Sequence, residues 1–183
     1  MTVPKLAPCT IEPCSTNHVE GVQGIYAHFV SSSLATFETE VPTSAQMLIR
    51  HDDIVRGGFP YLVALSGGQV VGYAYANSYR LRPAYRFTVE NSVYVAPAQH
   101  GLGIGRRLLT RLVAECTERG YRQMIAVIGD SANSASIGLH RAAGFHQVGT
   151  LLSVGYKHGS WVDTVLMQRE LSGARQDGGS HRS

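Results

Sequence analysis

The sequence has little of what marks secreted, metal-binding or membrane-embedded proteins. It contains three cysteines, Cys9, Cys14 and Cys116, and their odd number and irregular spacing argue against a disulfide framework and against a zinc site. It has no run of about 18 apolar residues, the length that a membrane-spanning helix needs. The first residues, MTVPKLAPCTIEPC, lack the apolar stretch of a signal peptide. We therefore expect a cytoplasmic protein without a membrane partner and without a bound metal.

Charge is also sparse. Charged residues make up 16% of the chain, the formal net charge is +3, and Lys and Arg form no long run. A nucleic-acid-binding protein usually concentrates basic residues on one arm or face, so we expect no nucleic-acid partner. The length and the hydrophobic content suit a single globular domain with a substantial core. We expect this domain to span 1–171 and the polar segment 172–183 to be a flexible tail.

Helical and strand patterns alternate along the chain. Apolar spacing predicts helices over 18–30, 42–58, 103–119 and 133–143. Shorter apolar or β-branched runs predict strands at 10–13, in two runs within 61–79, and at 87–97, 123–129, 145–157 and 161–171. The two runs within 61–79 are joined by Gly67-Gly68, which is typical of a tight hairpin. The order predicts a mixed α/β domain with hairpins near both ends.

The stretch QHGLGIGRR (99–107) places three glycines on alternate positions between a predicted strand and a predicted helix. A dinucleotide-binding fingerprint would need its third glycine one residue later and an acidic residue about 20 positions on. A nucleotide-triphosphate loop would need Gly-Lys-Ser/Thr, which is missing. Two interpretations remain at this point: a simple tight turn, or a pyrophosphate cradle of backbone N–H groups and a helix N-terminus, with Arg106 or Arg107 adding charge.

The surrounding residues favour the second interpretation. VYVAPAQHGLGIGRRLL resembles the acetyl-CoA motif of the GNAT N-acetyltransferases, and NSASIGLHRAAGF (133–145) resembles a second motif of that superfamily. The segments SLATFETE, AYRFTVENSVYV, AVIGDSANSAS and YKHGSWVDTVLMQ are similar to the phosphinothricin acetyltransferase family, which also contains methionine sulfoximine and sulfone acetyltransferases. The resemblance covers about residues 10 to 170.

The resemblance implies a single GNAT fold of the α/β (α+β) class. Its central twisted sheet would be mixed and mostly antiparallel, with about seven strands splayed between the fourth and fifth, flanked by about four helices. Acetyl-CoA would be the cosubstrate. The residues that the resemblance assigns to it are Val93, Tyr94, Val95, Gly101, Leu102, Gly103, Ile104, Gly105, Arg106, Asn133 and Ser136.

Acetyl transfer to an amine requires a base, because an α-amino group with a pKa of about 8 is mostly protonated at neutral pH. Glu90 is one of few acidic residues in an apolar strand, and the resemblance makes it the catalytic base rather than a solvent-facing carboxylate. His140 replaces the tyrosine that many GNAT enzymes place near the departing thiolate. It either donates a proton there or simply packs beside the cosubstrate.

The acceptor is expected to lie near YRLRPAYR (79–86), where Arg82 and Tyr85 match the family and a guanidinium can grip an anionic group in a two-point fork. With Glu90, Phe37 as an apolar wall completes the expected substrate-binding set. The roles of Lys157, His158 and Trp161, in the pocket or in a dimer contact, stay open.

We thus expect an acetyl-CoA-dependent transferase acting on a small amino-acid-like amine, and the resemblance implies a homodimer. The alternatives are a GNAT enzyme for another amine or a peptide N-terminus, and a non-catalytic acyl-CoA-binding module.

Overall fold

The computed structural model describes residues 9–171, so the expected flexible tail at 172–183 lies outside the described residues. Four helices follow the expected order, and they are α1 (Val19–Ser32), α2 (Ser44–Arg56), α3 (Ile104–Glu118) and α4 (Ser134–Ala142). The seven strands are β1 (Thr10–Pro13), β2 (Tyr61–Ser66), β3 (Gln69–Ser78), β4 (Thr88–Val95), β5 (Gln123–Gly129), β6 (His146–Lys157) and β7 (Ser160–Glu170). Within the described range, no helix is long and apolar enough to cross a membrane.

All seven strands belong to one sheet in the order β1-β2-β3-β4-β5-β7-β6. Every neighbouring pair is antiparallel except β4 and β5, which run parallel. The expected mixed, mostly antiparallel sheet of the α/β class is therefore confirmed. The hairpin predicted at Gly67-Gly68 joins β2 to β3.

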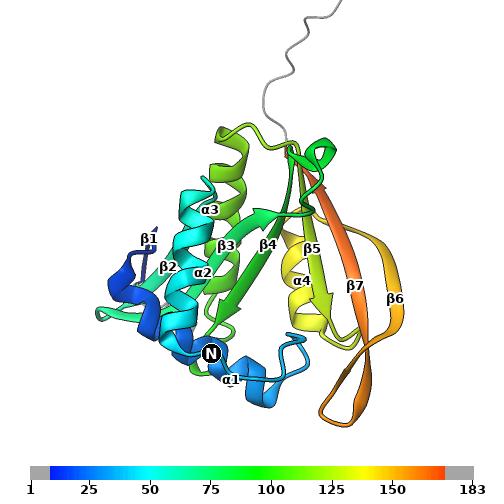
Figure 1. Ribbon diagram of the computed structural model, residues 1–183, viewed down its shortest axis with the longest axis horizontal. Coiled ribbons are helices and arrows are strands. Elements are labelled where there is room, and N and C mark those ends of the chain that lie inside the picture. The colour runs from blue at the N-terminus through cyan, green and yellow to red at the C-terminus, as the bar shows by residue number, and fades with distance from the viewer. Residues whose placement is uncertain (1–8, 172–183) are drawn as a thin grey trace, which may run out of the picture.

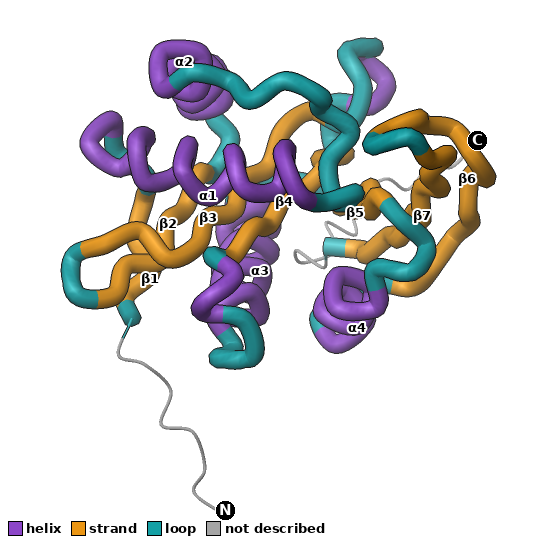
Figure 2. Tube along the Cα trace, turned by 90° about the horizontal axis from the view of Figure 1, so that it is seen from below, coloured by secondary structure: helices purple, strands orange, loops and turns teal. Residues whose placement is uncertain are grey.

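Helices cover both faces of the sheet, with α1 and α2 on one side and α3 and α4 on the other (Figure 2). The apolar stripe predicted for 103–119 buries Leu108, Leu109, Leu112 and Cys116 completely. Cys116 is therefore a core residue. On the other face, α2 begins at a capping box in which the Thr43 hydroxyl accepts from the Gln46 amide and the Gln46 side chain accepts from the Thr43 amide. The helix predicted over 42–58 is thus confirmed, and it begins within two residues of its predicted start.

The strands β4 and β5 are paired over only half of their length. Their register runs from Thr88 opposite Gln123 to Asn91 opposite Ala126 and then stops. Beyond that point β4 stays paired with β3, up to Val95 opposite Gly72, while β5 stays paired with β7. The two strands diverge below this point in Figure 1, and α4 lies behind the gap. The expected splay is present, and it positions the site.

Candidate active site

A groove of about 350 Å³ opens where β4 and β5 part. Its wall includes the unpaired half of β4, the end of β5, the glycine loop before α3, and one side of α4. Ten of the eleven residues expected to hold acetyl-CoA line this groove, namely Val93, Tyr94, Val95, Gly101, Gly103, Ile104, Gly105, Arg106, Asn133 and Ser136. The eleventh, Leu102, packs its side chain against the hydrophobic core, so only its backbone is available to a ligand.

The groove passes through the sheet from one face to the other. Because strand side chains alternate between faces, Val89 and Val93 of β4 pack with α3 in one core cluster, while Tyr94 packs with α1 in the other. Residues from both faces of the sheet line the groove, including Phe29 of α1 and Leu139 of α4. A ligand in the splay is therefore reachable from both faces.

The glycine loop has the backbone that a phosphate cradle requires. Gly101 and Gly103 have φ values of +78° and +76°, a left-handed conformation that costs about 1–2 kcal/mol for a residue with a Cβ. Gly103 is the N-cap of α3 and makes no side-chain capping bond, so the first N–H groups of the helix are not used by a cap. Together with the helix dipole, these donors form a site for an anion such as a pyrophosphate.

The two arginines after the loop have different roles. Arg106 lies on the groove wall, whereas Arg107 turns away from it. The Arg107 guanidinium donates to the backbone oxygen of Cys9 at 2.7 Å and to its sulfur at 2.6 Å, which ties α3 to the segment before β1. Only Arg106 is therefore placed to add charge at the cradle. Nearby, the side-chain oxygen of Gln99 is buried without a hydrogen-bond partner among the described residues, and Gln99 also lines the groove.

The unpaired edge of β4 suits an extended ligand. From Ser92 to Val95 the strand pairs with β3 on one side, and no strand pairs with its other edge, which faces the groove. On that edge the Val95 backbone oxygen accepts from His100 Nε2 at 2.9 Å. Backbone donors and acceptors on an open strand edge can pair with an amide-containing arm as an added strand would. The pantetheine arm of acetyl-CoA carries such amides, so the donor set fits this cosubstrate.

Glu90 stands immediately before the splay, on the face of β4 that carries α1 and α2. It is half-buried, and it pairs in register with Ile125 of β5 and Asn77 of β3. Burial raises the pKa of Glu90 above the ordinary glutamate value, while the positive charge of Arg80 lowers it in part. The carboxylate is not itself part of the groove wall, but its neighbours Asn91 and Ser92 are.

His140 lies on the opposite face, in the wall formed by α4. Its Nε2 is 2.9 Å from the side-chain oxygen of Asn91, and its Nδ1 is 2.8 Å from the backbone oxygen of Ser136. Burial lowers the pKa of His140, which favours the neutral ring, and a backbone hydrogen bond to Ser136 opposes the shift. The Asn91 amide also donates to the backbone oxygen of Ile125 at 3.0 Å. Asn91 therefore joins β4, β5 and α4 at the point where the strands separate.

The expected acceptor-side residues lie outside this groove. Arg82 and Tyr85 are exposed in the loop between β3 and β4, where a short 3₁₀ turn forms at Pro83–Tyr85. The Arg80 guanidinium covers the ring of Tyr79 at 4.8 Å. Phe37 is 39% exposed in the loop between α1 and α2. Arg80 was not in the expected set, yet its positive charge lowers the pKa of Glu90.

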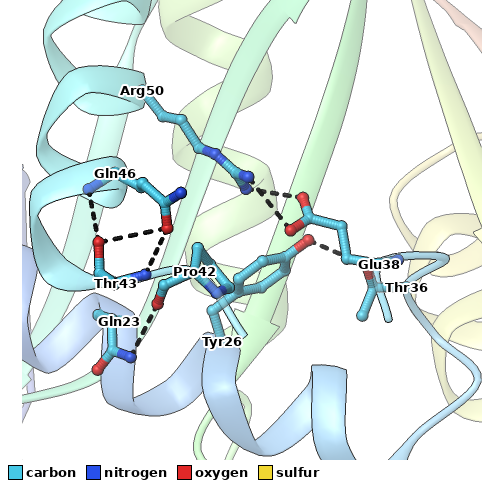
Figure 3. Close-up of polar contacts among 8 residues, drawn as sticks. All are labelled: Gln23, Tyr26, Thr36, Glu38, Pro42, Thr43, Gln46 and Arg50. Atoms are coloured by element: carbon cyan, nitrogen blue, oxygen red, sulfur yellow. Dashed lines mark hydrogen bonds and ion pairs between the residues drawn. The ribbon is translucent and has the colours of Figure 1, made fainter. Parts of the chain in front are cut away.

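The loop between α1 and α2 is held by polar contacts with both helices (Figure 3). Glu38 makes a two-point ion pair with Arg50 of α2, with N–O distances of 2.7 and 3.2 Å. The hydroxyls of Tyr26 and Thr36 lie 2.9 Å apart. Phe37 therefore stands on a loop whose neighbouring residues are fixed on both sides.

Several groove residues were not identified from the sequence. They are Phe29, Ala35, Asn91, Ser92, Gln99, His100, Ala126, Val127, Ile128, Ala135 and Leu139. A polar Asn next to Glu90 in an apolar strand was the available signal for Asn91. The others read as ordinary core or loop residues. Among residues 9–171, no group of three or more His, Cys, Asp or Glu side chains is arranged to hold a metal ion.

A splayed sheet with a glycine cradle at one end and an open strand edge along its wall defines the class of acyl-CoA-dependent transferases. Comparison with known proteins gives the family. The model of the acetyltransferase (GNAT) family matches residues 24–145, and the chain belongs to this family. It is therefore an N-acetyltransferase that uses acetyl-CoA.

Individual relatives cover most of the chain. A phosphinothricin N-acetyltransferase from Alcaligenes faecalis is 49% identical over 164 residues, which is 90% of this chain and 83% of that protein. An L-methionine sulfoximine/L-methionine sulfone acetyltransferase from Salmonella typhimurium is 39% identical over 147 residues, covering 80% and 85%. The crystal structure of a GNAT superfamily phosphinothricin acetyltransferase from Sinorhizobium meliloti, in complex with acetyl-CoA, has a TM-score of 0.86 at 46% identity, covering 89% of this chain and 88% of that one.

Proposed function

We propose that the domain, within residues 1–171, acetylates the α-amino group of a small amino-acid-like acceptor such as phosphinothricin, methionine sulfoximine or methionine sulfone. The observation that carries this proposal is Glu90, a half-buried carboxylate with a raised pKa at the mouth of the splay, next to the basic loop that contains Arg80 and Arg82. The names of the relatives support this class of acceptor.

In the proposed mechanism the acceptor enters from the α1/α2 face. Acetyl-CoA, when bound, supplies the activated acetyl carbonyl. Glu90 takes a proton from the acceptor ammonium, directly or through a water, and so frees the lone pair for attack. A backbone N–H of Val93 or Val95 on the open edge of β4 stabilises the negative charge that develops on the carbonyl oxygen. Arg82 and Tyr85 hold the anionic end of the acceptor, and Phe37 lies along its side chain.

His140 acts from the other face of the sheet. It reaches the groove near Asn91, and its buried, neutral ring can hydrogen-bond the departing sulfur. The proton that this sulfur takes up is the second one that the attacking nitrogen loses as the C–N bond forms and the C–S bond breaks. Glu90 and His140 thus approach the reacting atoms from opposite faces, which keeps a carboxylate and an imidazole from pairing with each other. Direct transfer then releases the amide and the free thiol without a covalent intermediate on the enzyme.

Turnover tests the proposal. Purified protein is incubated with acetyl-CoA and either phosphinothricin or methionine sulfone, and free thiol and the mass of the acetylated product are followed. We expect both acceptors to accelerate thiol release well above the acceptor-free rate. The same rate with and without either acceptor would reject this acceptor class, while the family assignment would stand.

We also propose that the enzyme is a homodimer that pairs through β6 and β7. Exposed apolar side chains gather on these two strands, and they are Val148, Leu151, Leu152, Val154, Tyr156 and Trp161. Sedimentation measures the mass. We expect a dimer for the wild type, a monomer for Leu152→Glu, and an unchanged dimer for Ile49→Glu, which places the same charge on an exposed residue of α2. A monomeric wild type would reject the proposal.

The proposed location is the cytoplasm. All three cysteines are free and buried, which suits a reducing compartment.

A further inference from the structure

The loop between α1 and α2 rests on the distal end of β6 at two positions, Gly155 and Lys157. They are two residues apart in one strand, so they lie on the same face of the sheet. Gly155 accommodates the ring of Phe37, and Lys157 binds the backbone of the loop at Ser33 and Thr36, just before Phe37. We call Gly155 and Lys157, together with Gly129 of β5, the loop seat.

Lys157 has an unusual environment for a charged residue. Its side chain is 2% exposed, and its ammonium donates to three backbone oxygens rather than to a carboxylate. The distances are 2.7 Å to Ser33, 2.8 Å to Thr36 and 3.4 Å to Phe29. A buried charge is tolerated only when its donors are satisfied, and the last carbonyls of a helix are good acceptors for a cation. Lys157 therefore fixes the end of α1 and the first residues of the loop.

The glycines of the seat are required by close approach. A Cβ built on Gly155 would overlap the ring of Phe37. A Cβ on Gly129 would lie 2.5 Å from the backbone oxygen of Leu34 and 3.2 Å from Cε2 of Phe37. Gly155 has a negative φ, so no special backbone conformation requires a glycine there. The absence of a side chain at this position serves the packing of Phe37. The ring of Phe37 can pack this close to the sheet only because both positions lack a side chain.

The face on which Phe37 rests is the face from which Glu90 acts. Along β5, alternation places Ile125, Val127 and Gly129 on one face, and Ile125 is the register partner of Glu90. Val127 is 38% exposed, so no helix covers this part of the face. Phe37 on Gly129 thus closes the far end of an open floor that begins at Glu90.

From this arrangement we infer that Gly155 and Lys157 are specificity-determining positions for the acceptor, because they set how close Phe37 stands to the floor on which the acceptor side chain lies. This inference rests on the proposed function, and it identifies the part of the site that selects acceptors by the size of their side chain. A side chain at residue 155 lifts the ring off the sheet into the space above the floor. Loss of the Lys157 ammonium releases the loop that carries the ring.

The test compares Gly155→Ala with Gly149→Ala, a glycine of the same strand at which a Cβ meets nothing within 4 Å. The measured quantity is the ratio of kcat/KM for ethionine sulfone to kcat/KM for methionine sulfone, which differ by one methylene. One methylene in an apolar pocket changes kcat/KM by about tenfold or more. We expect Gly155→Ala to lower the ratio by roughly tenfold, Phe37→Ala to raise it by a similar factor, and Gly149→Ala to leave it unchanged. The KM for acetyl-CoA should stay within about twofold in all three.

A ratio that Gly155→Ala leaves unchanged, or a parallel loss with both acceptors and with acetyl-CoA, overturns the inference. Hydrogen exchange of residues 33–38 gives a second measurement that does not depend on turnover. We expect faster exchange there in Gly155→Ala and in Lys157→Met but not in Gly149→Ala, and equal exchange in all of them contradicts the seat. If the wild type acetylates neither sulfone, the function proposed above is wrong, and exchange alone then decides whether the seat holds the loop.

Discussion

The groove proposed for acetyl-CoA and the proposed acceptor side lie next to the same strand, β4, yet different kinds of contact form them. The groove contacts proposed for acetyl-CoA include backbone groups: an open strand edge, two left-handed glycines and a helix N-terminus, all between Ser92 and Arg106. The proposed acceptor side is made by side chains from three distant segments, the loops around Phe37 and Arg82 and the end of β6. Changes on the two sides should therefore separate in kinetics, with the first altering the KM for acetyl-CoA and the second altering the KM for the amine.

The largest effect is expected at Glu90, which lies between the two sides and which we propose as the base of the chemical step. Glu90→Gln removes the base, so kcat should fall by about a hundredfold to ten-thousandfold. Acetyl-CoA affinity, measured by calorimetry, should not change. Glu118→Gln, at an exposed position of α3, is the matched control and should keep full activity. A kcat within threefold of wild type would show that Glu90 is not the base.

The glycine loop offers the next largest effect. Gly103→Ala imposes the left-handed φ on a residue with a Cβ, at a cost of about 1–2 kcal/mol, which should appear as a rise of roughly tenfold in the KM for acetyl-CoA with little change in the amine KM. Gly138→Ala is the control, since that helical glycine has open space around it and an ordinary φ. Equal KM values for the two variants would contradict a cradle that depends on this conformation.

Asn91 bonds to α4 and to β5 at the point where β4 and β5 separate, and the next largest effect is expected there. Asn91→Leu removes the bonds to His140 and Ile125 and leaves buried groups unpaired, which should lower the free energy of unfolding by about 1–3 kcal/mol. Because His140 loses its support, kcat should fall more than either KM rises. Thermal unfolding and steady-state kinetics measure both quantities. A stable variant with an unchanged kcat would argue against a positioning role.

A smaller effect should distinguish the two arginines. Arg106→Gln removes a charge at the cradle and should raise the KM for acetyl-CoA by about threefold, more strongly at low salt. Arg107→Gln should leave that KM unchanged and lower stability by about 1–3 kcal/mol, because it breaks the bonds to Cys9. If Arg107→Gln raises the KM for acetyl-CoA and Arg106→Gln does not, then Arg107 and not Arg106 contacts the ligand.

The smallest effect is a shift in pH dependence on the acceptor side. A base must be ionised to work, so kcat/KM should fall as the pH drops through the pKa of Glu90, which burial raises. The positive charge of Arg80 lowers that pKa, and Arg80→Gln should therefore move the acidic limb of the profile to higher pH. Arg56→Gln, on the exposed end of α2, should not move it. If the acidic limb does not move, the charge of Arg80 does not influence the pKa of the base.

The parts of the site that were predictable from the sequence are those made by consecutive residues. The cradle 101–106 was predicted because three alternate glycines stand in one short segment and because that segment resembles a known acetyl-CoA motif. Asn91, Gln99 and the buried Lys157 were not recognised as groove or loop-anchoring residues. Asn91 and Lys157 bond to partners that lie 34 to 128 residues away in the sequence. A pattern of neighbouring residues does not predict contacts over such separations.

The amino-acid sequence by itself determined the order of helices and strands, because hydrophobic periodicity and backbone preferences act within a few residues, and its resemblance to a known family implied the mixed sheet and favoured the cradle. Only the tertiary structure decided which arginine faces the groove, that Glu90 and His140 stand on opposite faces of β4, and that Phe37 lies on two glycines of other strands. These outcomes depend on how strands from distant parts of the chain pair and twist. A side chain acquires its neighbours only when that packing is complete.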